Sequence, residues 1–179
     1  MEFSIKTLTR LLGLVLIVFL ISAVTSYKFG SVRELALEKP KSYVSADNVD
    51  RTLDCLAMNI YKEAGSEPFE GKVAVAQVTL NRADDPRFPK DICKVVMQKN
   101  VVMERVVCQF SWYCDGMPAK KVNNKAYDES YAVAKKVLLE GFRLDSLKDA
   151  LYYHAVYVRP QWPHEKITQI GNHIFYRNK

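Results

Sequence analysis

Residues 60–82 read IYKEAGSEPFEGKVAVAQVTLNR, and this stretch decides the fold class. It holds the end of one predicted helix and the whole of a second. Upstream, apolar residues recur at three- and four-residue steps and predict a helix from its cap, Asp47, to about Ala64. Pro68 prevents that helix from continuing. The second helix, 69–82, is apolar nearly all round, so we expect it to be the central buried helix.

Beyond residue 82 the sequence predicts both helices and strands. A Gly-Asn pair between two apolar runs, at Gly171 and Asn172, is typical of a β-hairpin. The other predicted elements are a short helix at 91–98, a strand at 106–112, a long helix at 125–140 and a strand at 150–158. Helices followed by a small antiparallel sheet predict an α+β fold with a helical core.

Length and composition limit the class of protein. The chain has 179 residues, of which 49% are apolar and 26% charged, as in an ordinary globular domain with a short extension. Its net charge of +6 suits an anionic partner such as nucleic acid, a membrane surface or a cell-wall polymer. The charges are interspersed, with no basic run and no DNA-reading helix, so we expect no nucleic-acid partner.

The N-terminus has the pattern of a membrane-targeting segment. Lys6 and Arg10 precede an uncharged, apolar stretch over residues 11–27. Such a stretch predicts a signal anchor or a cleaved signal peptide, and we favour the anchor because the stretch approaches the length that spans a bilayer. The chain is therefore expected to be exported and to face the periplasm or cell wall, anchored or released. The predicted organisation is a signal segment at 1–27, a tether at 28–46 and a folded domain at 47–179.

Four cysteines lie in the predicted exported domain, at Cys55, Cys93, Cys108 and Cys114. An even number outside the cytoplasm predicts two disulfides, and four cysteines allow three pairings. Their spacing matches no familiar zinc pattern, so we expect no metal. The alternatives are buried free thiols, or a cysteine nucleophile partnered by a histidine.

Glu63 is the strongest catalytic candidate. It lies in the last turn of the first predicted helix, where the negative end of the helix dipole and apolar neighbours raise the pKa of a carboxylate. A carboxylic acid held protonated near neutral pH is what glycoside cleavage needs as a general acid. The alternative is a solvated surface glutamate. A second carboxylate, as in ordinary glycosidases, would have to come from Glu67, Glu70 or Asp115.

Two histidines, His154 and His173, lie in strand-like aromatic stretches. Together with neighbouring rings they are candidates to line a groove that stacks on sugar faces, with alternate side chains pointing to the groove and to the core. The chain has no phosphate-binding glycine-rich loop and no serine-hydrolase elbow, so no cofactor is expected.

Five segments, in order along 53–176, resemble the cell-wall hydrolase family typified by the spore-cortex-lytic enzyme SleB. They read IYKEAGSEPFEGKVAVAQVTLNR, PRFPKDIC, CQFSWYCDG, ALYYHAVYVRPQW and IGNHIFY. The resemblance implies a lysozyme-like α+β fold and cleavage of peptidoglycan glycan strands, notably as a lytic transglycosylase. It places the family's catalytic glutamate on Glu63. The usual Tyr-x-Glu-Ala-Arg-Gly-Glu context is altered here, because Gly65 and Ser66 replace its Arg-Gly pair.

The polar residues of the resembling segments are candidate substrate contacts. These are Asn81, Gln109, Ser111, Tyr153, His154, Asn172 and His173. The alternative for each is a structural hydrogen bond. The expected partners are peptidoglycan and, through the N-terminal segment, a membrane, with the folded domain acting as a monomer.

The predicted reaction cleaves the bond between N-acetylmuramic acid and N-acetylglucosamine, with Glu63 acting first as acid and then as base. A facing second carboxylate would instead make the enzyme a muramidase. The remaining alternatives are a peptidoglycan amidase or peptidase and an inactive, membrane-tethered wall-binding module. A Gram-negative envelope enzyme and a phage lysis enzyme fit the sequence equally well.

Overall fold

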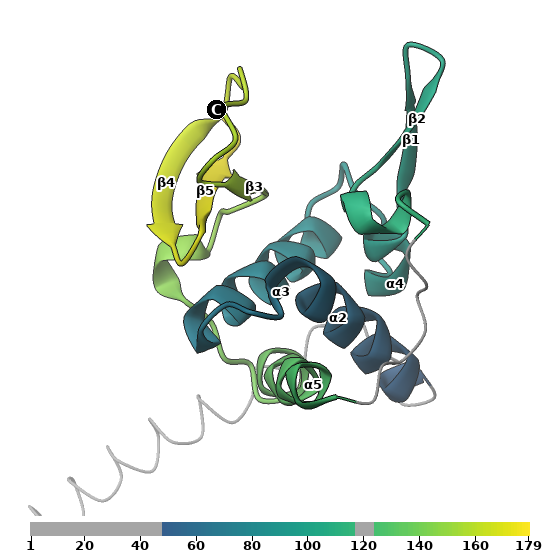
Figure 1. Cartoon of the computed structure of the whole chain (residues 1–179), viewed down its shortest axis with the longest axis vertical. Helices are drawn as coiled ribbons and strands as arrows, with labels where there is room; N and C mark the ends of the chain where they lie inside the picture. The colour runs from purple at the N-terminus through teal and green to yellow at the C-terminus, as the bar shows by residue number, and fades with distance from the viewer. Residues whose placement is uncertain (1–47, 117–123) are drawn as a thin grey trace, which may run out of the picture. The chain divides into compact units, whose positions relative to one another are not determined.

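The computed structural model describes residues 48–116 and 124–179, which belong to one structural unit (Figure 1). Its helices are α2 (Val49–Ala64), α3 (Phe69–Asp84), α4 (Ile92–Val96), η2 (Ser111–Tyr113), α5 (Lys125–Leu138) and η3 (Asp145–Leu147). Its strands are β1 (Lys99–Val102), β2 (Arg105–Cys108), β3 (Tyr152–Ala155), β4 (Glu165–Ile170) and β5 (His173–Arg177). The predicted α+β class is confirmed. The predicted signal segment, the tether and the cap Asp47 lie outside the described residues.

Helix α3 is the central helix, as its all-round apolar pattern predicts. It contacts α2, α4, α5, η3 and β4, and its residues from Gly71 to Leu80 are all buried. Alanine and valine side chains allow its neighbours to approach closely. The core therefore forms around α3, with α2 and α5 packed against it and against each other.

Helix α2 buries one face, as its spacing predicts. The buried apolar residues on that face are Leu53, Leu56, Ala57, Ile60 and Ala64. A buried polar link joins this face to the next layer, because Asn59 Nδ2 donates to Thr79 Oγ1 at 3.1 Å and Trp112 Nε1 donates to Asn59 Oδ1 at 3.0 Å. That link holds η2 against α2 and α3.

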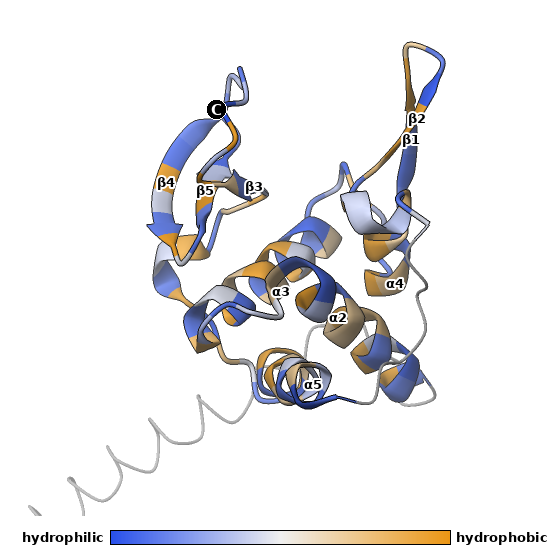
Figure 2. Ribbon diagram, in the orientation of Figure 1, coloured by the Kyte–Doolittle hydropathy of each residue, from blue (hydrophilic) through white to orange (hydrophobic). Residues whose placement is uncertain are grey.

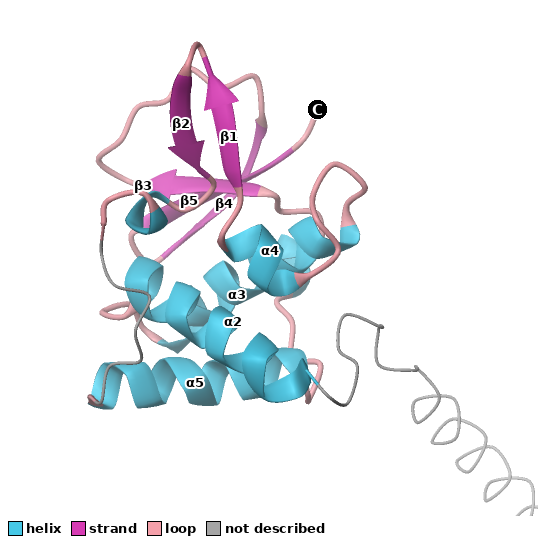
Figure 3. Cartoon of the chain, turned by 90° about the vertical axis from the view of Figure 1, so that its right-hand side faces the viewer, coloured by secondary structure: helices cyan, strands magenta, loops and turns pink. Residues whose placement is uncertain are grey.

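Both sheets lie on one side of the helical layer, and α5 lies on the opposite side (Figure 3). The sequence prediction of one strand over 106–112 is confirmed only in its first part, because β2 ends at Cys108. Strands β1 and β2 form a two-stranded hairpin, and Ser111–Tyr113 is a 3₁₀ turn. The chain turns there because the Cys108–Cys114 disulfide closes a short loop and the buried Trp112 is drawn toward Asn59.

The second sheet has three strands in the order β3–β5–β4, all antiparallel. The predicted hairpin at Gly171–Asn172 is confirmed, and Gly171 has φ +56°, a left-handed conformation that glycine adopts without strain. Strand β3 is shorter than predicted, since the chain turns after Ala155. Tyr153 pairs with the buried Phe175 on the face toward α3, while the next register pair, Tyr152 and Tyr176, points to the other face.

The four cysteines form the two predicted disulfides. The pairs are Cys55–Cys93, which joins α2 to α4, and Cys108–Cys114, which closes the base of the β1–β2 hairpin. None of the four remains a free thiol, so the alternative of a cysteine nucleophile is wrong. Over residues 48–116 and 124–179, no helix has the length and apolar character needed to cross a membrane.

Candidate active site

Glu63 lies in the last turn of α2, one residue before the helix ends at Ala64. Its side chain is partly buried. The hydroxyl of Tyr153, on β3, donates a hydrogen bond to Glu63 Oε2 at 3.0 Å. The carboxyl group therefore stands where the helical layer meets the three-stranded sheet, with one oxygen held from the sheet side.

Burial is the main reason why the pKa of Glu63 is raised above its ordinary value. The negative charge of Asp115 raises this pKa further. The hydrogen bond from Tyr153 and the positive charge of Arg82 act in the opposite direction and favour the carboxylate. The balance leaves an acid that keeps its proton to higher pH than a solvated glutamate, as the sequence predicts.

Tyr153 is a fixed donor in this site. Its burial and the nearby charge of Glu63 hold its pKa well above the usual value for tyrosine. The hydroxyl therefore stays protonated and can donate to Glu63 when that group is ionised. A donor that bonds better to the carboxylate than to the acid stabilises the state formed after proton transfer.

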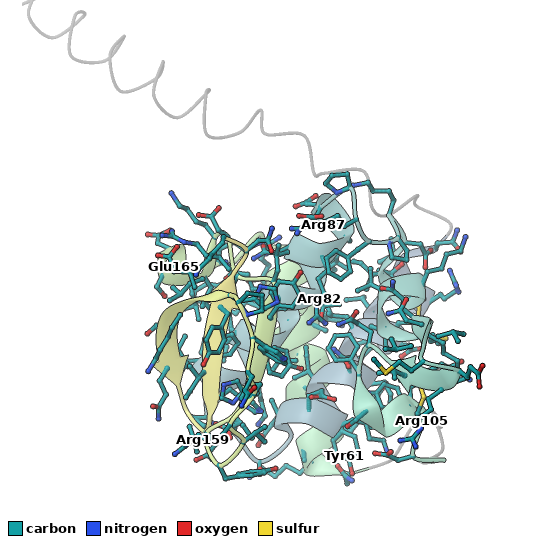
Figure 4. The ribbon with its side chains drawn as sticks, turned by 90° about the horizontal axis from the view of Figure 1, so that it is seen from above. Tyr61, Arg82, Arg87, Arg105, Arg159 and Glu165 are labelled. Carbon is teal, nitrogen blue, oxygen red and sulfur yellow. A yellow bond between two sulfur atoms is a disulfide. The ribbon has the colours of Figure 1, made fainter. Side chains whose placement is uncertain are left out.

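Arg82, at the end of α3, is a site residue that the sequence reasoning missed. It is only 4% exposed, and its charge acts on both Glu63 and Tyr153. Its Nε donates to the carbonyl oxygen of Leu151 at 2.8 Å. Figure 4 shows Arg82 in the middle of the domain, between the three-stranded sheet and the β1–β2 segment, whereas Arg159 and Arg105 lie at the edges. An arginine in the last turn of a largely apolar, buried helix is the sequence feature that would have identified Arg82.

The segment after β2 supports Arg82 from the other side. The guanidinium carbon lies 4.9 Å from the ring centre of Phe110 in this segment and 5.7 Å from that of Phe88, which lies between α3 and α4; both are cation–π distances. With the Gln109 amide oriented so that its oxygen faces the guanidinium, this oxygen accepts bonds from Arg82 Nη2 at 3.2 Å and Nη1 at 3.3 Å. The predicted substrate contact Gln109 thus lies beside Arg82.

Among the candidate second carboxylates, only Asp115 acts on Glu63 through its charge. Glu67 is buried, and both of its carboxylate oxygens accept hydrogen bonds from Asn172. Glu70 is exposed at the start of α3. Glu67 is therefore already engaged within the protein, while Asp115 stands exposed near the acid.

His173 lies on the same face of the sheet as Tyr153, with ring centres 5.2 Å apart and an edge-to-face angle of 86°. It is buried, and this burial lowers its pKa against the raising effect of Glu67. A neutral imidazole therefore packs against the tyrosine. Among the described atoms, its Nδ1 has no hydrogen-bond partner.

Of three further predicted contacts, His154 and Asn81 make structural hydrogen bonds and Ser111 is exposed. His154 points to the outer face of the sheet, where its Nδ1 donates to the Ala155 carbonyl and its Nε2 accepts from Tyr176, both at 2.8 Å. Asn81 Nδ2 donates to the carbonyl oxygens of Leu147 and Ala150 and so holds the chain before β3. Ser111 is exposed at the start of η2.

The described residues contain no group of three or more histidine, cysteine, aspartate or glutamate side chains placed to hold a metal ion. The groups that surround Glu63 offer acid–base chemistry: a partly buried carboxyl group, a tyrosine donor and an arginine charge.

The family described as Cell Wall Hydrolase matches residues 66–176, a span that begins just after Glu63. Among curated proteins, the spore cortex-lytic enzyme of Bacillus subtilis is 31% identical over 124 residues, which cover 67% of this chain and 35% of that protein. The spore cortex-lytic enzyme of Oceanobacillus iheyensis is 30% identical over 140 residues, covering 76% and 43%. The matched part thus spans well under half the length of these relatives.

Two solved structures share the fold. The catalytic domain of the Bacillus cereus SleB protein matches with a TM-score of 0.57 and 25% identity, covering 76% of this chain and 98% of that domain. The catalytic domain of the germination-specific lytic transglycosylase SleB from Bacillus anthracis matches with a TM-score of 0.56 and 26% identity, covering 75% and 100%. Both alignments cover nearly the whole of the solved domains.

Proposed function

Because this chain belongs to the cell wall hydrolase family, we propose that it cleaves peptidoglycan glycan strands as a lytic transglycosylase that uses Glu63 as its single catalytic carboxyl group. The bond cleaved lies between N-acetylmuramic acid and N-acetylglucosamine. The observation that carries the proposal is the environment of Glu63, a carboxyl group with a raised pKa and one oxygen held by Tyr153. The likeness to a solved lytic transglycosylase domain supports it.

In the first step, protonated Glu63 donates its proton to the glycosidic oxygen. The bond from the muramyl C1 to that oxygen breaks, and the N-acetylglucosamine end leaves as an alcohol. Positive charge develops at C1 and the ring oxygen. The raised pKa lets Glu63 keep its proton to higher pH than a solvated glutamate, and a bound proton is the condition for this step.

In the second step, the carboxylate of Glu63 accepts the proton of the muramyl 6-hydroxyl. The 6-oxygen bonds to C1 and closes a 1,6-anhydro ring, so no water enters the product. Between the two steps Glu63 is an anion. Tyr153 and Arg82 both favour that anion, since the bond from the first and the charge of the second lower its pKa.

One observation favours a second candidate, a muramidase. Asp115 is exposed and close enough for its charge to raise the pKa of Glu63. A carboxylate in that position has the chemistry to direct water at C1, and the product would then carry a reducing muramyl end. The engagement of Glu67 by Asn172 supports the transglycosylase, because this carboxylate is not available to water.

The compartment follows from the disulfides and the family. Two disulfides in a cell wall hydrolase indicate a folded domain outside the cytoplasm. We further propose that residues 1–27 act as a signal anchor, that residues 28–46 tether a monomeric, lysozyme-like domain to the membrane, and that this arrangement holds the enzyme close to the wall.

The test is the full-length chain with Glu63→Gln, assayed for release of soluble fragments from purified peptidoglycan. Glutamine keeps the shape but has no acidic proton to transfer, so activity is expected to fall by about 10²- to 10⁴-fold with unchanged far-UV circular dichroism. Glu70→Gln, an exposed carboxylate at the start of α3, is the matched control and should retain activity. Wild-type activity in Glu63→Gln would contradict the proposal, and an inactive wild type would favour a binding module.

A further inference from the structure

We propose that Glu67 is a positioning residue that holds Tyr153 against Glu63 without touching the substrate. The inference rests on the proposed function and concerns the same site. Glu67 lies in the short connection between α2 and α3, and its backbone N–H donates to the carbonyl oxygen of Ala64 at 3.0 Å. Its backbone is therefore joined directly to the end of the helix that carries Glu63.

The carboxylate of Glu67 binds the turn between β4 and β5. Its Oε2 accepts from the backbone N–H of Asn172 at 3.1 Å, and its Oε1 accepts from the side-chain Nδ2 of the same residue at 2.8 Å. The side chain is only 6% exposed, and its partner is 105 positions away in the sequence. A buried carboxylate that accepts two bonds is a strong connection, because breaking it leaves a charge without solvation.

Two glycines leave the space that this side chain occupies. A Cβ atom at Gly71 would lie 2.8 Å from Glu67 Cβ, and one at Gly171 would overlap Glu67 Oε2. Gly171 also has φ +56°, which disfavours any other residue. The turn and the start of α3 are thus shaped around the Glu67 carboxylate.

From Asn172 the connection reaches Tyr153 through the sheet. The carbonyl oxygen of Asn172 accepts from the N–H of Val156, just beyond β3, at 2.9 Å. At the other end of β3, the carbonyl oxygen of Leu151 accepts from Arg82 Nε at 2.8 Å. Tyr153 lies between these two attachments, so one anchor on each side fixes β3 relative to the helices. Glu67 provides the anchor at the hairpin end.

This placement predicts an effect on the acidity of Glu63. The charged or titratable groups that act on Glu63 are Tyr153 from β3, Arg82 from α3 and Asp115 after η2. Those near the Glu67 anchor are His173 and, on the opposite face of the sheet, His154. The hydrogen bond from Tyr153 lowers the pKa of Glu63. Loosening the hairpin end of β3 weakens this bond, so the pKa of Glu63 should rise. The alkaline limb of the activity profile should then move to higher pH.

The discriminating pair of variants is Glu67→Ala and Glu67→Gln, in the full-length chain. Alanine removes both bonds, so kcat per folded molecule should fall by about tenfold to a hundredfold, with the alkaline limb shifted upward. In Glu67→Gln the glutamine side-chain oxygen can still accept from the backbone N–H of Asn172. The glutamine Nε2 can donate to the side-chain oxygen of Asn172 once the Asn172 amide is rotated. The kcat of Glu67→Gln should therefore remain within about threefold of wild type, because replacing charge-assisted hydrogen bonds by neutral ones is a modest loss.

Glu165→Gln is the matched control. Glu165 accepts two bonds from Arg177, from Nε at 3.0 Å and from Nη2 at 2.6 Å, but it is exposed on the same sheet and lies away from α2. Its replacement should leave both kcat and the pH profile unchanged. If Glu67→Ala does not fold, Asn172→Ala, which keeps the backbone bond, should shift the alkaline limb in the same direction by a smaller amount.

Each outcome has one reading. Glu67→Gln as inactive as Glu63→Gln would overturn the proposal and make Glu67 a catalytic carboxylate. Wild-type activity and pH profile in Glu67→Ala, or in folded Asn172→Ala, would also overturn it. If Glu63→Gln itself stays active, the proposed function fails independently of the result at Glu67.

Discussion

The two sheets stand on the same side of the helical layer but differ in how they are attached to it. The three-stranded sheet buries Phe175 completely and is joined to the helices through Tyr153, Asn172 and the carbonyl of Leu151. The β1–β2 hairpin projects into solvent, with Val101 75% and Met103 93% exposed. Figure 2 shows apolar residues along this projecting hairpin.

The three-stranded sheet supports the candidate acid, whereas the β1–β2 hairpin mainly extends into solvent. The three-stranded sheet supplies the side chain that bonds Glu63, and the strand that carries it, β3, is attached at both of its ends. The hairpin contributes only at its base, where Gln109 and Phe110 contact Arg82 and Cys108–Cys114 closes the loop. Substitutions on the buried face of the three-stranded sheet should therefore affect stability and chemistry together, and substitutions at exposed positions along the hairpin should affect neither.

The sharpest test of this comparison is a pair of truncations, one in each sheet. Phe175→Ala removes a fully buried ring and should lower the free energy of unfolding by about 3–5 kcal/mol. Val106→Ala, at a mostly exposed hairpin position, should change it by no more than about 0.5 kcal/mol. Urea unfolding followed by circular dichroism measures both. Similar losses in the two variants would show that the hairpin is packed as firmly as the sheet.

The two disulfides allow the hairpin base to be compared with the helical layer, because Cys108–Cys114 lies at that base and Cys55–Cys93 joins α2 to α4. Cys55–Cys93 closes a separation of 38 residues and Cys108–Cys114 one of 6. If the main effect is on the unfolded chain, replacing both cysteines by serine should cost about 4 kcal/mol for the first pair and about 2 kcal/mol for the second. Only the second replacement should also reduce activity, because it frees the segment that carries Gln109 and Phe110. The reverse order of stability losses would contradict this.

The smallest effect concerns the single bond between sheet and acid. Tyr153→Phe removes a hydrogen bond that lowers the pKa of Glu63, so this pKa should rise. Because Glu63 must be protonated to act, the alkaline limb of kcat should move upward, by about one pH unit for a charge-assisted bond. The pH dependence of fragment release from peptidoglycan measures it. A shift to lower pH would mean that the tyrosine does not stabilise the anion.

Local patterns were sufficient to predict the long helices α2, α3 and α5, the closing hairpin and the raised pKa of Glu63. A periodic apolar face and a Gly-Asn turn depend on neighbouring residues only, and a helix end is visible from its breaker. The β1–β2 hairpin escaped prediction because Met103 and Glu104 occupy its turn at positive φ without the usual glycine or asparagine.

The rest of the site depends on contacts between distant segments. Arg82 is placed by Leu151, Phe110 and Gln109, none of which is its neighbour in the sequence. Glu67 and Asn172 carry no local signal of their partnership. His154 and Tyr153 are adjacent in one aromatic stretch, yet the strand places them on opposite faces, and only the pairing with β5 shows which face meets Glu63.

We propose that Glu63 promotes closure of a 1,6-anhydromuramyl ring, so that no water enters the product. The most direct measurement is mass spectrometry of the fragments that the full-length protein and its Glu63→Gln variant release from purified peptidoglycan. We expect 1,6-anhydromuramyl ends from the wild type and none from the variant. Reducing muramyl ends from the wild type would contradict it and direct attention to Asp115 as a second carboxylate, and cut peptides with intact glycan strands would replace the glycosidase with an amidase.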